Sequence, residues 1–282
     1  MDAHGSFRGW RAASVLSQEE KASQHLGYWG EITGTLDWCE ENYLVTLYVA
    51  EWWNTLSNMG MVFLSILGVY LAAREKFPLS IKLMYLALLG VGIGSAVFHG
   101  TLQWYGQLLD ELPMLWGNSI LFFNSHHKER RDNNFISCVL FSVVYGVGVT
   151  AIYLYNHNAV FFETSYGLGV AFLIYTCTLY LKKYDHPELR ILVTRALAYY
   201  GFAFFVWNID NNFCGTLRSL RYENPLAPVF QFHAHWHWFA GFGTYHYMIF
   251  TTFIHMLEQG KEVDLKYIFW IIPYVSARHM KT

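Results

Sequence analysis

The sequence predicts an all-α membrane protein, a bundle of seven transmembrane helices. Of the 282 residues, 54% are hydrophobic and 19% aromatic, whereas only 14% are charged, which is far from the average of soluble domains. Uncharged runs of about 20 residues, the length that a helix needs to cross a bilayer, recur along the chain. These runs are too long and too continuous for barrel strands, so helices are expected.

The expected spans follow one another with short charged loops between them. They lie near residues 52–73, 82–101, 108–126, 134–155, 160–181, 191–214 and 231–256. These spans belong to one seven-helix domain over residues 27–257, and residues 1–26, which mix charged and small side chains, are expected to be a mobile extension. Residues 258–282 form a tail. Within it "YIFWIIPYV" is too short to cross a bilayer and is expected to lie at the interface.

The positions of the basic residues predict the orientation of the bundle. Of the 19 Lys and Arg residues, 14 fall in the loops after the first, third and fifth spans and in the tail. Cytoplasmic loops carry the excess of Lys and Arg. We therefore expect a lumenal or extracellular N-terminus and a cytosolic C-terminus.

Three histidines stand close together in "QFHAHWHWFAGFGTY", at the start of the seventh span. Because each residue of a helix turns by about 100°, His233 and His237 share a face and His235 points away. Two imidazoles four residues apart can bind one metal ion, but the motif is weak and two ordinary polar residues are the alternative. Their place inside a spanning helix favours a function, since ionisable groups are costly there.

A third histidine is expected at the same leaflet. His99 ends the second span, with Ser95 one turn below it, and Asp110 opens the third span. Three histidines with one open position are the ligands of a catalytic zinc site, where bound water becomes acidic enough to attack a carbonyl. Asp110 would accept a proton, and Ser95 would donate a hydrogen bond to the oxyanion or, alternatively, join two helices. The arrangement predicts hydrolysis of an amide or ester inside a membrane.

An acidic segment, residues 35–51, precedes the first span. Its oxygen donors Asp37, Glu40, Asn42 and Glu51 suit calcium, although the spacing is not that of an EF-hand. By itself, a solvated acidic cap is the simpler interpretation.

The four cysteines allow one pairing by topology. Cys39 and Cys214 both lie on the outer side, whereas Cys138 is on the cytosolic side and Cys177 is within the bilayer. In an oxidising compartment a disulfide between Cys39 and Cys214 is expected, with two unpaired, packed thiols as the alternative.

Four ordered motifs resemble the alkaline ceramidases, most closely the alkaline phytoceramidase subtype. They are "GYWGEITGTLDWCEENYLVTLYVAEWWNTLSN", "GIGSAVFHGTLQWYGQLLDELPM", "FVWNIDNNFC" and "QFHAHWHWFAGFGTY". The resemblance runs from about residue 27 to 275. It departs from the family in the long N-terminal extension and in His235, where the subtype often has an aromatic residue.

The resemblance implies hydrolysis of ceramides to a sphingoid base and a fatty acid. It implies zinc on His99, His233 and His237, with Ser95 and Asp110 as catalytic residues. It further implies a calcium ion bound by the Asp37, Glu40, Asn42 and Glu51 side chains and the Trp38 carbonyl, and the Cys39–Cys214 disulfide.

The resemblance also sets expectations for the protein's surroundings. The partners are the membrane bilayer and the ceramide substrate, with no nucleic acid, and the protein is expected to be a monomer in endoplasmic reticulum or Golgi membranes. Two other interpretations stay open. One is a lipid-sensing receptor of the adiponectin-receptor type with a structural or weakly catalytic zinc, and a more distant one is haem ligation. The role of Asp210, near the outer end of the sixth span, is also open between a site contact and a packing or capping function.

Overall fold

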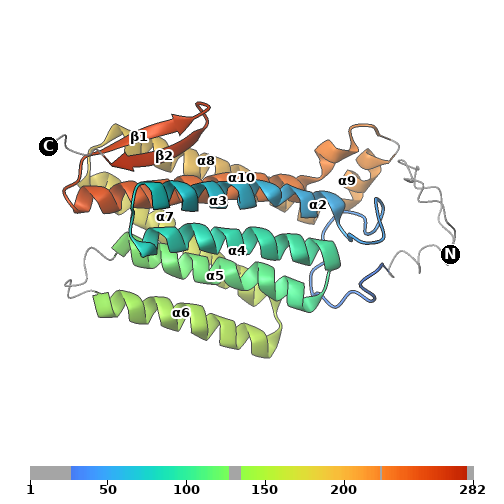
Figure 1. The fold of residues 1–282 in the computed structure, drawn as a ribbon. Helices are drawn as coiled ribbons and strands as arrows, with labels where there is room; N and C mark the ends of the chain where they lie inside the picture. Colours follow the sequence, from blue (N-terminus) through green and yellow to red (C-terminus); the bar gives the residue numbers. More distant parts are fainter. Residues whose placement is uncertain (1–26, 127–134, 223, 278–282) are drawn as a thin grey trace, which may run out of the picture.

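The chain folds into a bundle of long helices with a small β-hairpin at one end (Figure 1). The computed structural model describes residues 27–126, 135–222 and 224–277. The expected extension over residues 1–26, the loop after the third span, residue 223 and the last five residues of the tail lie outside the described residues.

The expected spans coincide with helices to within about four residues at each end. The helices of the described part are α2 (Trp52–Ser57), α3 (Met59–Arg74), α4 (Leu79–Thr101), α5 (Trp104–His126), α6 (Phe135–Asn156), α7 (Ala159–Lys183), α8 (Pro187–Asn212), α9 (Cys214–Arg221) and α10 (Phe232–Glu258), with a 3₁₀ turn, η1, at Ala227–Phe230. The first expected span is made of α2 and α3 in succession. The short helix α9 follows the sixth span and had no counterpart in the prediction.

Five of these helices are long and apolar enough to cross a membrane, namely α2 with α3, α4, α6, α7 and α8. Helices α5 and α10 are as long, with 23 and 27 residues, but they are not among these five. Helix α5 carries two adjacent carboxylates and α10 carries five histidines. Because ionisable residues inside a bilayer usually serve a function, these two helices are where the chemistry is expected.

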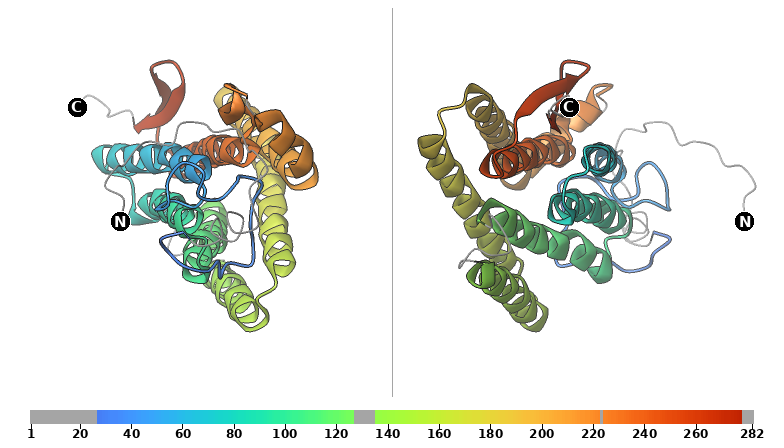
Figure 2. Two further views of the ribbon diagram at one scale, coloured as in Figure 1. Left: turned by 90° about the vertical axis from the view of Figure 1, so that its right-hand side faces the viewer. Right: turned by 60° about the vertical axis from the view of Figure 1, so that its left-hand side comes forward.

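The outer helices expose apolar side chains, as a lipid-facing surface requires. Helix α6 lies at the edge of the bundle farthest from the hairpin (Figures 1 and 2). Ile136 and Val144 of α6 and Leu168 of α7 are each about two-thirds exposed. In water such a surface would be unfavourable, whereas in a bilayer it contacts acyl chains. The chain is therefore a multi-pass membrane protein.

Helices α4 and α5 form a tight hairpin because small and cyclic residues meet at their contact. Pro113 has no N–H, so the carbonyl of Leu109 lacks its partner in helix α5. Gly94 of α4 packs directly against this carbonyl, and a Cβ atom there would lie only 1.8 Å from the Leu109 oxygen. Close approach of the two backbones brings the next residues, Ser95 and Asp110, to the same place.

The N-terminal segment, residues 27–51, wraps over the end of this hairpin. Leu102 ends α4 in the left-handed conformation, with φ of 52°, and its carbonyl accepts hydrogen bonds from the N–H groups of Thr33 and Gly34. Further along, the Glu51 N–H donates to the His99 carbonyl at 2.9 Å. These backbone contacts hold the acidic segment against the end of α4.

The tail contains a β-hairpin, which the helical prediction did not include. Strands β1 (Val263–Ile268) and β2 (Ile272–Ala277) pair in antiparallel register, with Leu265 opposite Val275. Val275 is buried against the bundle core, in which Phe250 and Phe253 of α10 also lie. The "YIFWIIPYV" segment therefore forms most of this hairpin.

Candidate metal centre and cavity

The three predicted histidines meet at one end of the bundle. His99 comes from the last turn of α4, and His233 and His237 from the first two turns of α10. All three side chains are almost completely buried, and one potential ligand nitrogen from each lies within 4.8 Å of the others. In the described part of the chain, no other group of three or more His, Cys, Asp or Glu residues gathers its ligand atoms in this way.

Hydrogen bonds fix the tautomer of His237. The Ser57 hydroxyl donates its single proton to the Asn54 carbonyl at 2.8 Å. The same oxygen lies 2.7 Å from Nδ1 of His237, so it must accept a proton from that nitrogen. The lone pair of His237 is therefore on Nε2, the nitrogen available to a metal.

The Glu51 carboxylate fixes His99 in the same way. Its Oε2 atom accepts a short hydrogen bond from Nδ1 of His99, and both groups are buried. Nε2 of His99 is buried without a hydrogen-bond partner. A carboxylate behind a ligating imidazole is the usual outer partner at metal sites, because it holds the ring and raises its basicity.

His233 is held by stacking and by its backbone. The Trp38 ring is stacked on the His233 ring, with centroids 4.0 Å apart. The Asp210 carboxylate accepts hydrogen bonds from the N–H groups of His233 and Cys39, both at 3.3 Å. Asp210 is thus a cap at the start of α10 and a link to the acidic segment. Of the two roles that the sequence left open for it, capping is the one these contacts describe.

The donor set fits zinc. Three neutral imidazoles are typical ligands of a catalytic zinc ion, and two of them here are oriented by outer partners. Nε2 of His99 and Nδ1 of His233 are buried polar atoms with no other partner, which is costly unless something binds there. The sequence pattern had not indicated Ser57 or Asn54, because neither residue forms a recognisable motif with the histidines.

His235 lies away from this centre, as the helical geometry predicted. Its Nε2 contacts the Val229 carbonyl at 3.0 Å, in the turn before α10. It is not part of the histidine group.

Ser95 and Asp110 lie beside the histidines. Ser95 is buried, and its hydroxyl is 3.5 Å from Nε2 of His237. Asp110 is partly buried, interacts with Ser95 and lines the same cavity as His233 and His237. Asp110 is in the second turn of α5 rather than at its start, because the helix begins at Trp104.

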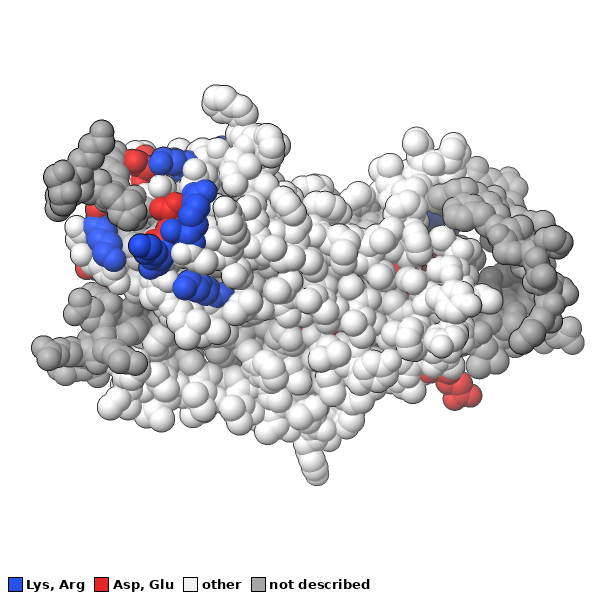
Figure 3. All heavy atoms as spheres, viewed as in Figure 1, with Lys and Arg blue, Asp and Glu red and all other residues white. Residues whose placement is uncertain are grey.

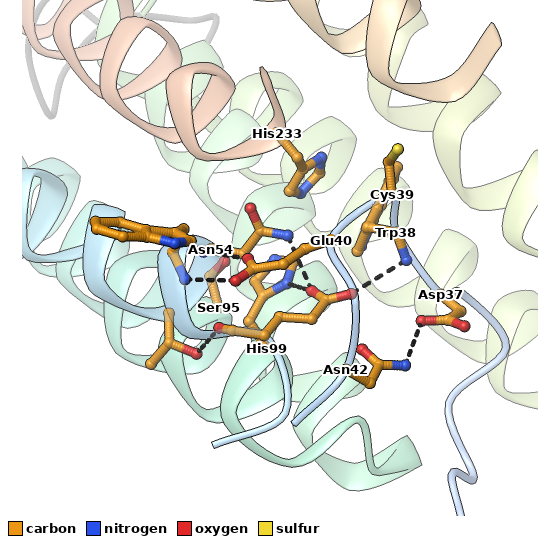
Figure 4. Close-up of polar contacts among 12 residues, drawn as sticks. Asp37, Trp38, Cys39, Glu40, Asn42, Asn54, Ser95, His99 and His233 are labelled. Atoms are coloured by element: carbon orange, nitrogen blue, oxygen red, sulfur yellow. Dashed lines mark hydrogen bonds and ion pairs between the residues drawn. The ribbon is translucent and has the colours of Figure 1, made fainter. Parts of the chain in front are cut away.

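The acidic segment surrounds the outer side of the centre. The two carboxylate oxygens of Glu40 accept hydrogen bonds from the N–H groups of Trp53 and Asn54, so Glu40 caps helix α2 (Figure 4). Burial, followed by the nearby charge of Glu51, raises the pKa of Glu40 to about 8. Burial also raises the pKa of Glu51 to about 8. Two buried carboxylates near one another are unfavourable unless a proton or a cation offsets their charge.

The expected calcium ligands do not form a coordination shell in this arrangement. Asp37 accepts a hydrogen bond from the Asn42 amide at 3.0 Å, and Glu51 accepts from the Trp38 N–H as well as from His99. Within the described residues these carboxylates are not grouped as a metal site is. Calcium is therefore not supported by this geometry and stays a prediction.

Cys39 and Cys214 form the expected disulfide, which joins the acidic segment to the start of α9. Arg221, at the end of α9, donates to the Cys39 carbonyl at 2.6 Å and forms an ion pair with Glu41. The other two cysteines, Cys138 and Cys177, are free and buried. The disulfide and Arg221 hold Cys39 in place. They thereby position the preceding residue, Trp38, whose ring stacks on His233.

A large apolar cavity opens from the histidine centre into the bundle. Its volume is about 540 Å³, and along α10 its lining runs from His233 to Met248, which corresponds to about 22 Å of helix. Most of the lining is aliphatic or aromatic, and Ser95, Asp110, His233 and His237 are among its polar residues. The sequence had not indicated Tyr166, Tyr200 or Glu163, which also line it, because residues on α7 and α8 reach the cavity only through the packing of the bundle.

Comparisons with known proteins agree on one family. Residues 30–276 match the family model described as ceramidase. The chain is 39% identical to alkaline ceramidase 3 of Mus musculus over 252 residues, covering 88% of this chain and 94% of the mouse protein. It is 28% identical to alkaline ceramidase of Arabidopsis thaliana, covering 90% and 97% of the two chains, and 26% identical to alkaline ceramidase 1 of Homo sapiens, covering 86% and 94%. Together with the buried histidine centre, these matches establish that the chain belongs to the ceramidase family.

Proposed function

We propose that this protein is an alkaline ceramidase, which hydrolyses the amide bond of ceramides to a sphingoid base and a fatty acid. The observation that carries the proposal is the position of the histidine centre, at one end of a mostly apolar cavity inside a membrane protein. A two-chain lipid presents an amide between long hydrocarbon chains. The cavity offers apolar walls for hydrocarbon and polar groups at one end for the amide.

We propose that His99, His233 and His237 hold a catalytic zinc ion. Bound zinc supplies a Lewis acid for the amide carbonyl and makes water nucleophilic near neutral pH. Ser57 and Glu51 would keep the imidazoles of His237 and His99 with Nε2 turned to the ion.

Ser95 and Asp110 would act on the substrate itself. The Ser95 hydroxyl, close to His237, is suited to donate a hydrogen bond to the amide oxygen as negative charge develops there. Asp110 would accept the proton from the attacking water and then give it to the leaving amine, which is a poor leaving group without a proton. Ser95 directly follows Gly94 in the chain, and Asp110 directly follows Leu109. The close approach of the α4 and α5 backbones at Gly94 and Leu109 therefore sets the distance between the Ser95 and Asp110 side chains.

We propose calcium as a second, structural ion near the acidic segment. The side chains of Glu40 and Glu51, two buried acidic residues near one another, support this, because a cation would offset their charge. Binding through Asp37, Asn42 and the Trp38 carbonyl would require a local rearrangement of the present hydrogen bonds. Chelation of the purified enzyme tests the idea. A lower melting temperature that calcium alone restores is expected, and no change would reject the ion.

The finer aspects of the function are proposed on the family resemblance and the charge distribution. We infer seven crossings with the histidine centre at the lumenal or extracellular side and the basic end in the cytosol. Lys and Arg gather at the hairpin end of the visible face, and most of the remaining surface is uncharged (Figure 3). We further propose that the protein is a monomer of the phytoceramidase subtype in endoplasmic reticulum or Golgi membranes. Its chain would consist of an extension over residues 1–26, the seven-helix domain over residues 27–257 and a tail over residues 258–282.

The experiment compares His99→Ala and His237→Ala with the parent protein in detergent or lipid nanodiscs. Zinc content and release of fatty acid from ceramide, dihydroceramide and phytoceramide are measured. We expect loss of zinc and of hydrolysis in both variants, with the melting temperature showing that the bundle still folds. Hydrolysis that survives either substitution would reject the mechanism. Zinc without hydrolysis of any substrate by the parent protein would instead favour a lipid-sensing receptor.

A further inference from the structure

The tip of the β-hairpin exposes three consecutive large apolar side chains. Phe269 is 84% exposed, Trp270 93% and Ile271 58%, whereas Val275 in the same hairpin is only 2% exposed. The tip lies on the opposite end of α10 from His233 and shares no residue with the cavity. A patch of this kind in contact with water is unfavourable and usually marks a binding surface.

The turn at the tip is unusual for these residues. The Ile271 N–H donates to the Ile268 carbonyl at 3.1 Å, and the two residues between them, Phe269 and Trp270, have positive φ values of 47° and 64°. These are the φ signs of a type I′ turn, in which Asn-Gly is strongly preferred. Two bulky aromatic residues are kept in a backbone conformation that disfavours them, which points to a function of their side chains.

Specific contacts fix the hairpin to the bundle, so the tip has a defined position. The Tyr245 hydroxyl of α10 donates to the Pro273 carbonyl at 3.0 Å. The Arg74 guanidinium, at the end of α3, lies over the Tyr274 ring at 5.2 Å. From the base the hairpin runs back along the bundle, towards its middle, and the tip stands away from α10 (Figure 1).

The depth of the tip follows from these contacts. Arg74 is at the end of a membrane-crossing helix, where charged residues reach the headgroups. Tyr274 is at the level of Arg74, and Trp270 is four residues further along the hairpin, which is about 13 Å in an extended strand. The tip therefore reaches the boundary between headgroups and acyl chains, the layer in which Trp side chains are enriched.

Positive charges surround the rest of the hairpin. The Arg195 guanidinium of α8 lies over the Tyr267 ring at 5.3 Å, and the exposed Lys266 extends from β1. Figure 3 shows several Lys and Arg side chains, with some Asp and Glu among them, over this end of the molecule. Basic groups beside an apolar insertion attract anionic lipid headgroups.

We propose that the hairpin tip, Phe269–Ile271, is a membrane anchor that inserts into the interface of the leaflet at the basic end of the bundle. The partner is the lipid bilayer with anionic headgroups. The anchor ties the end of α10 to the membrane surface, and it does not depend on the proposed reaction.

Labelling in nanodiscs of phosphatidylcholine and phosphatidylserine tests the anchor. Trp270→Cys is compared with Lys261→Cys, an exposed position before β1, and the parent chain, whose free cysteines are buried, is the blank. We expect a membrane-impermeant maleimide to react roughly tenfold more slowly at position 270, a factor that corresponds to about 1.4 kcal/mol. A fluorophore at position 270 should also be quenched by lipids with a nitroxide high on the acyl chain. Equal labelling and no quenching would overturn the proposal.

A second variant separates insertion from hairpin folding. Phe269→Asn with Trp270→Gly installs the preferred I′ residues, so the hairpin keeps its turn and loses its aromatic side chains. With Ile271→Cys as the reporter in both backgrounds, the Asn-Gly variant should label several-fold faster and retain full ceramide hydrolysis. Labelling that stays equally slow would show that the aromatic residues do not hold the tip in lipid, and would also overturn the proposal.

Discussion

Replacing Ser57 by alanine tests whether outer hydrogen bonds control the histidine centre. The Ser57 oxygen is the acceptor for Nδ1–H of His237, at 2.7 Å, and both residues are buried. Without it, the imidazole must either leave a buried N–H unsatisfied or change to the tautomer in which Nε2 carries the proton. The first option costs about 1 to 3 kcal/mol, and the second removes the lone pair from the nitrogen that faces the centre.

The expected loss of zinc affinity in Ser57→Ala follows from this cost. If zinc binding through Nε2 must be accompanied by an unsatisfied N–H, the zinc dissociation constant rises by roughly 5- to 150-fold. Loss of an outer partner at metal sites typically lowers affinity by 10- to 100-fold, which is the same range. We therefore expect Ser57→Ala to bind zinc about tenfold or more weakly, and to recover hydrolysis as zinc is added.

The assay is equilibrium competition for zinc with a chelator, on purified protein in detergent, followed by ceramide hydrolysis at each free zinc concentration. Ser65→Ala is the matched control. Ser65 is also buried, in helix α3, but its hydroxyl donates to the Met61 carbonyl of the same helix and does not contact the histidines. Both variants lose one buried hydroxyl, but Ser57→Ala should show the lower melting temperature, because it also leaves a buried imidazole nitrogen without its partner. Equal zinc affinity in the two variants would refute the assigned tautomer.

Three further predictions concern packing and cross-linking. Gly94→Ala should destabilise the protein by roughly 1 to 3 kcal/mol or more, because the new Cβ would lie 1.8 Å from the Leu109 carbonyl oxygen. Gly90→Ala is the control: its Cβ would have its nearest neighbour at 3.6 Å, so the melting temperature should not change. Similar melting temperatures for the two variants would contradict the close contact. Cys214→Ser should cost about 2 to 4 kcal/mol, seen as a lower melting temperature without reductant, and an unchanged value would show that the disulfide is dispensable. Ala240 lines the cavity, so Ala240→Phe should fill part of the space for an acyl chain. The variant should lower kcat/KM for long-chain ceramides by roughly tenfold and affect short-chain ceramides less. An equal effect on both would show that the acyl chain does not occupy the cavity.

The helices could be predicted from sequence because the bilayer imposes length and composition on them. Each expected span overlaps one helix, or α2 and α3 together, and His235 was correctly separated from His233 and His237. The ends were less accurate: α8 begins at Pro187 rather than 191, and α5 at Trp104 rather than 108. Helices extend beyond the apolar core, and local capping rather than hydrophobicity sets where they stop.

The hairpin was missed because its signal is weak in sequence. Residues 267–275 are apolar and include Pro273, which argues against a central strand and gives no hint of a partner. In the structure Pro273 lies in a two-stranded sheet, in which both strands are edge strands and a residue without an N–H is tolerated. Its carbonyl accepts a hydrogen bond from the Tyr245 hydroxyl. Pairing over the short turn and packing against α10 both depend on the folded bundle.

The number of long helices, the apolar surface and the face shared by His233 and His237 could be predicted, because hydropathy and the 3.6-residue period are local properties of the chain. Which groups stand behind the ligands depends on how the helices pack. Ser57 and Glu51 are 180 and 48 residues away from the histidines that they contact. No period or motif encodes such pairs. They form because α2, α4 and α10 pack closely enough to remove water, and each buried polar atom must then find its partner within the protein.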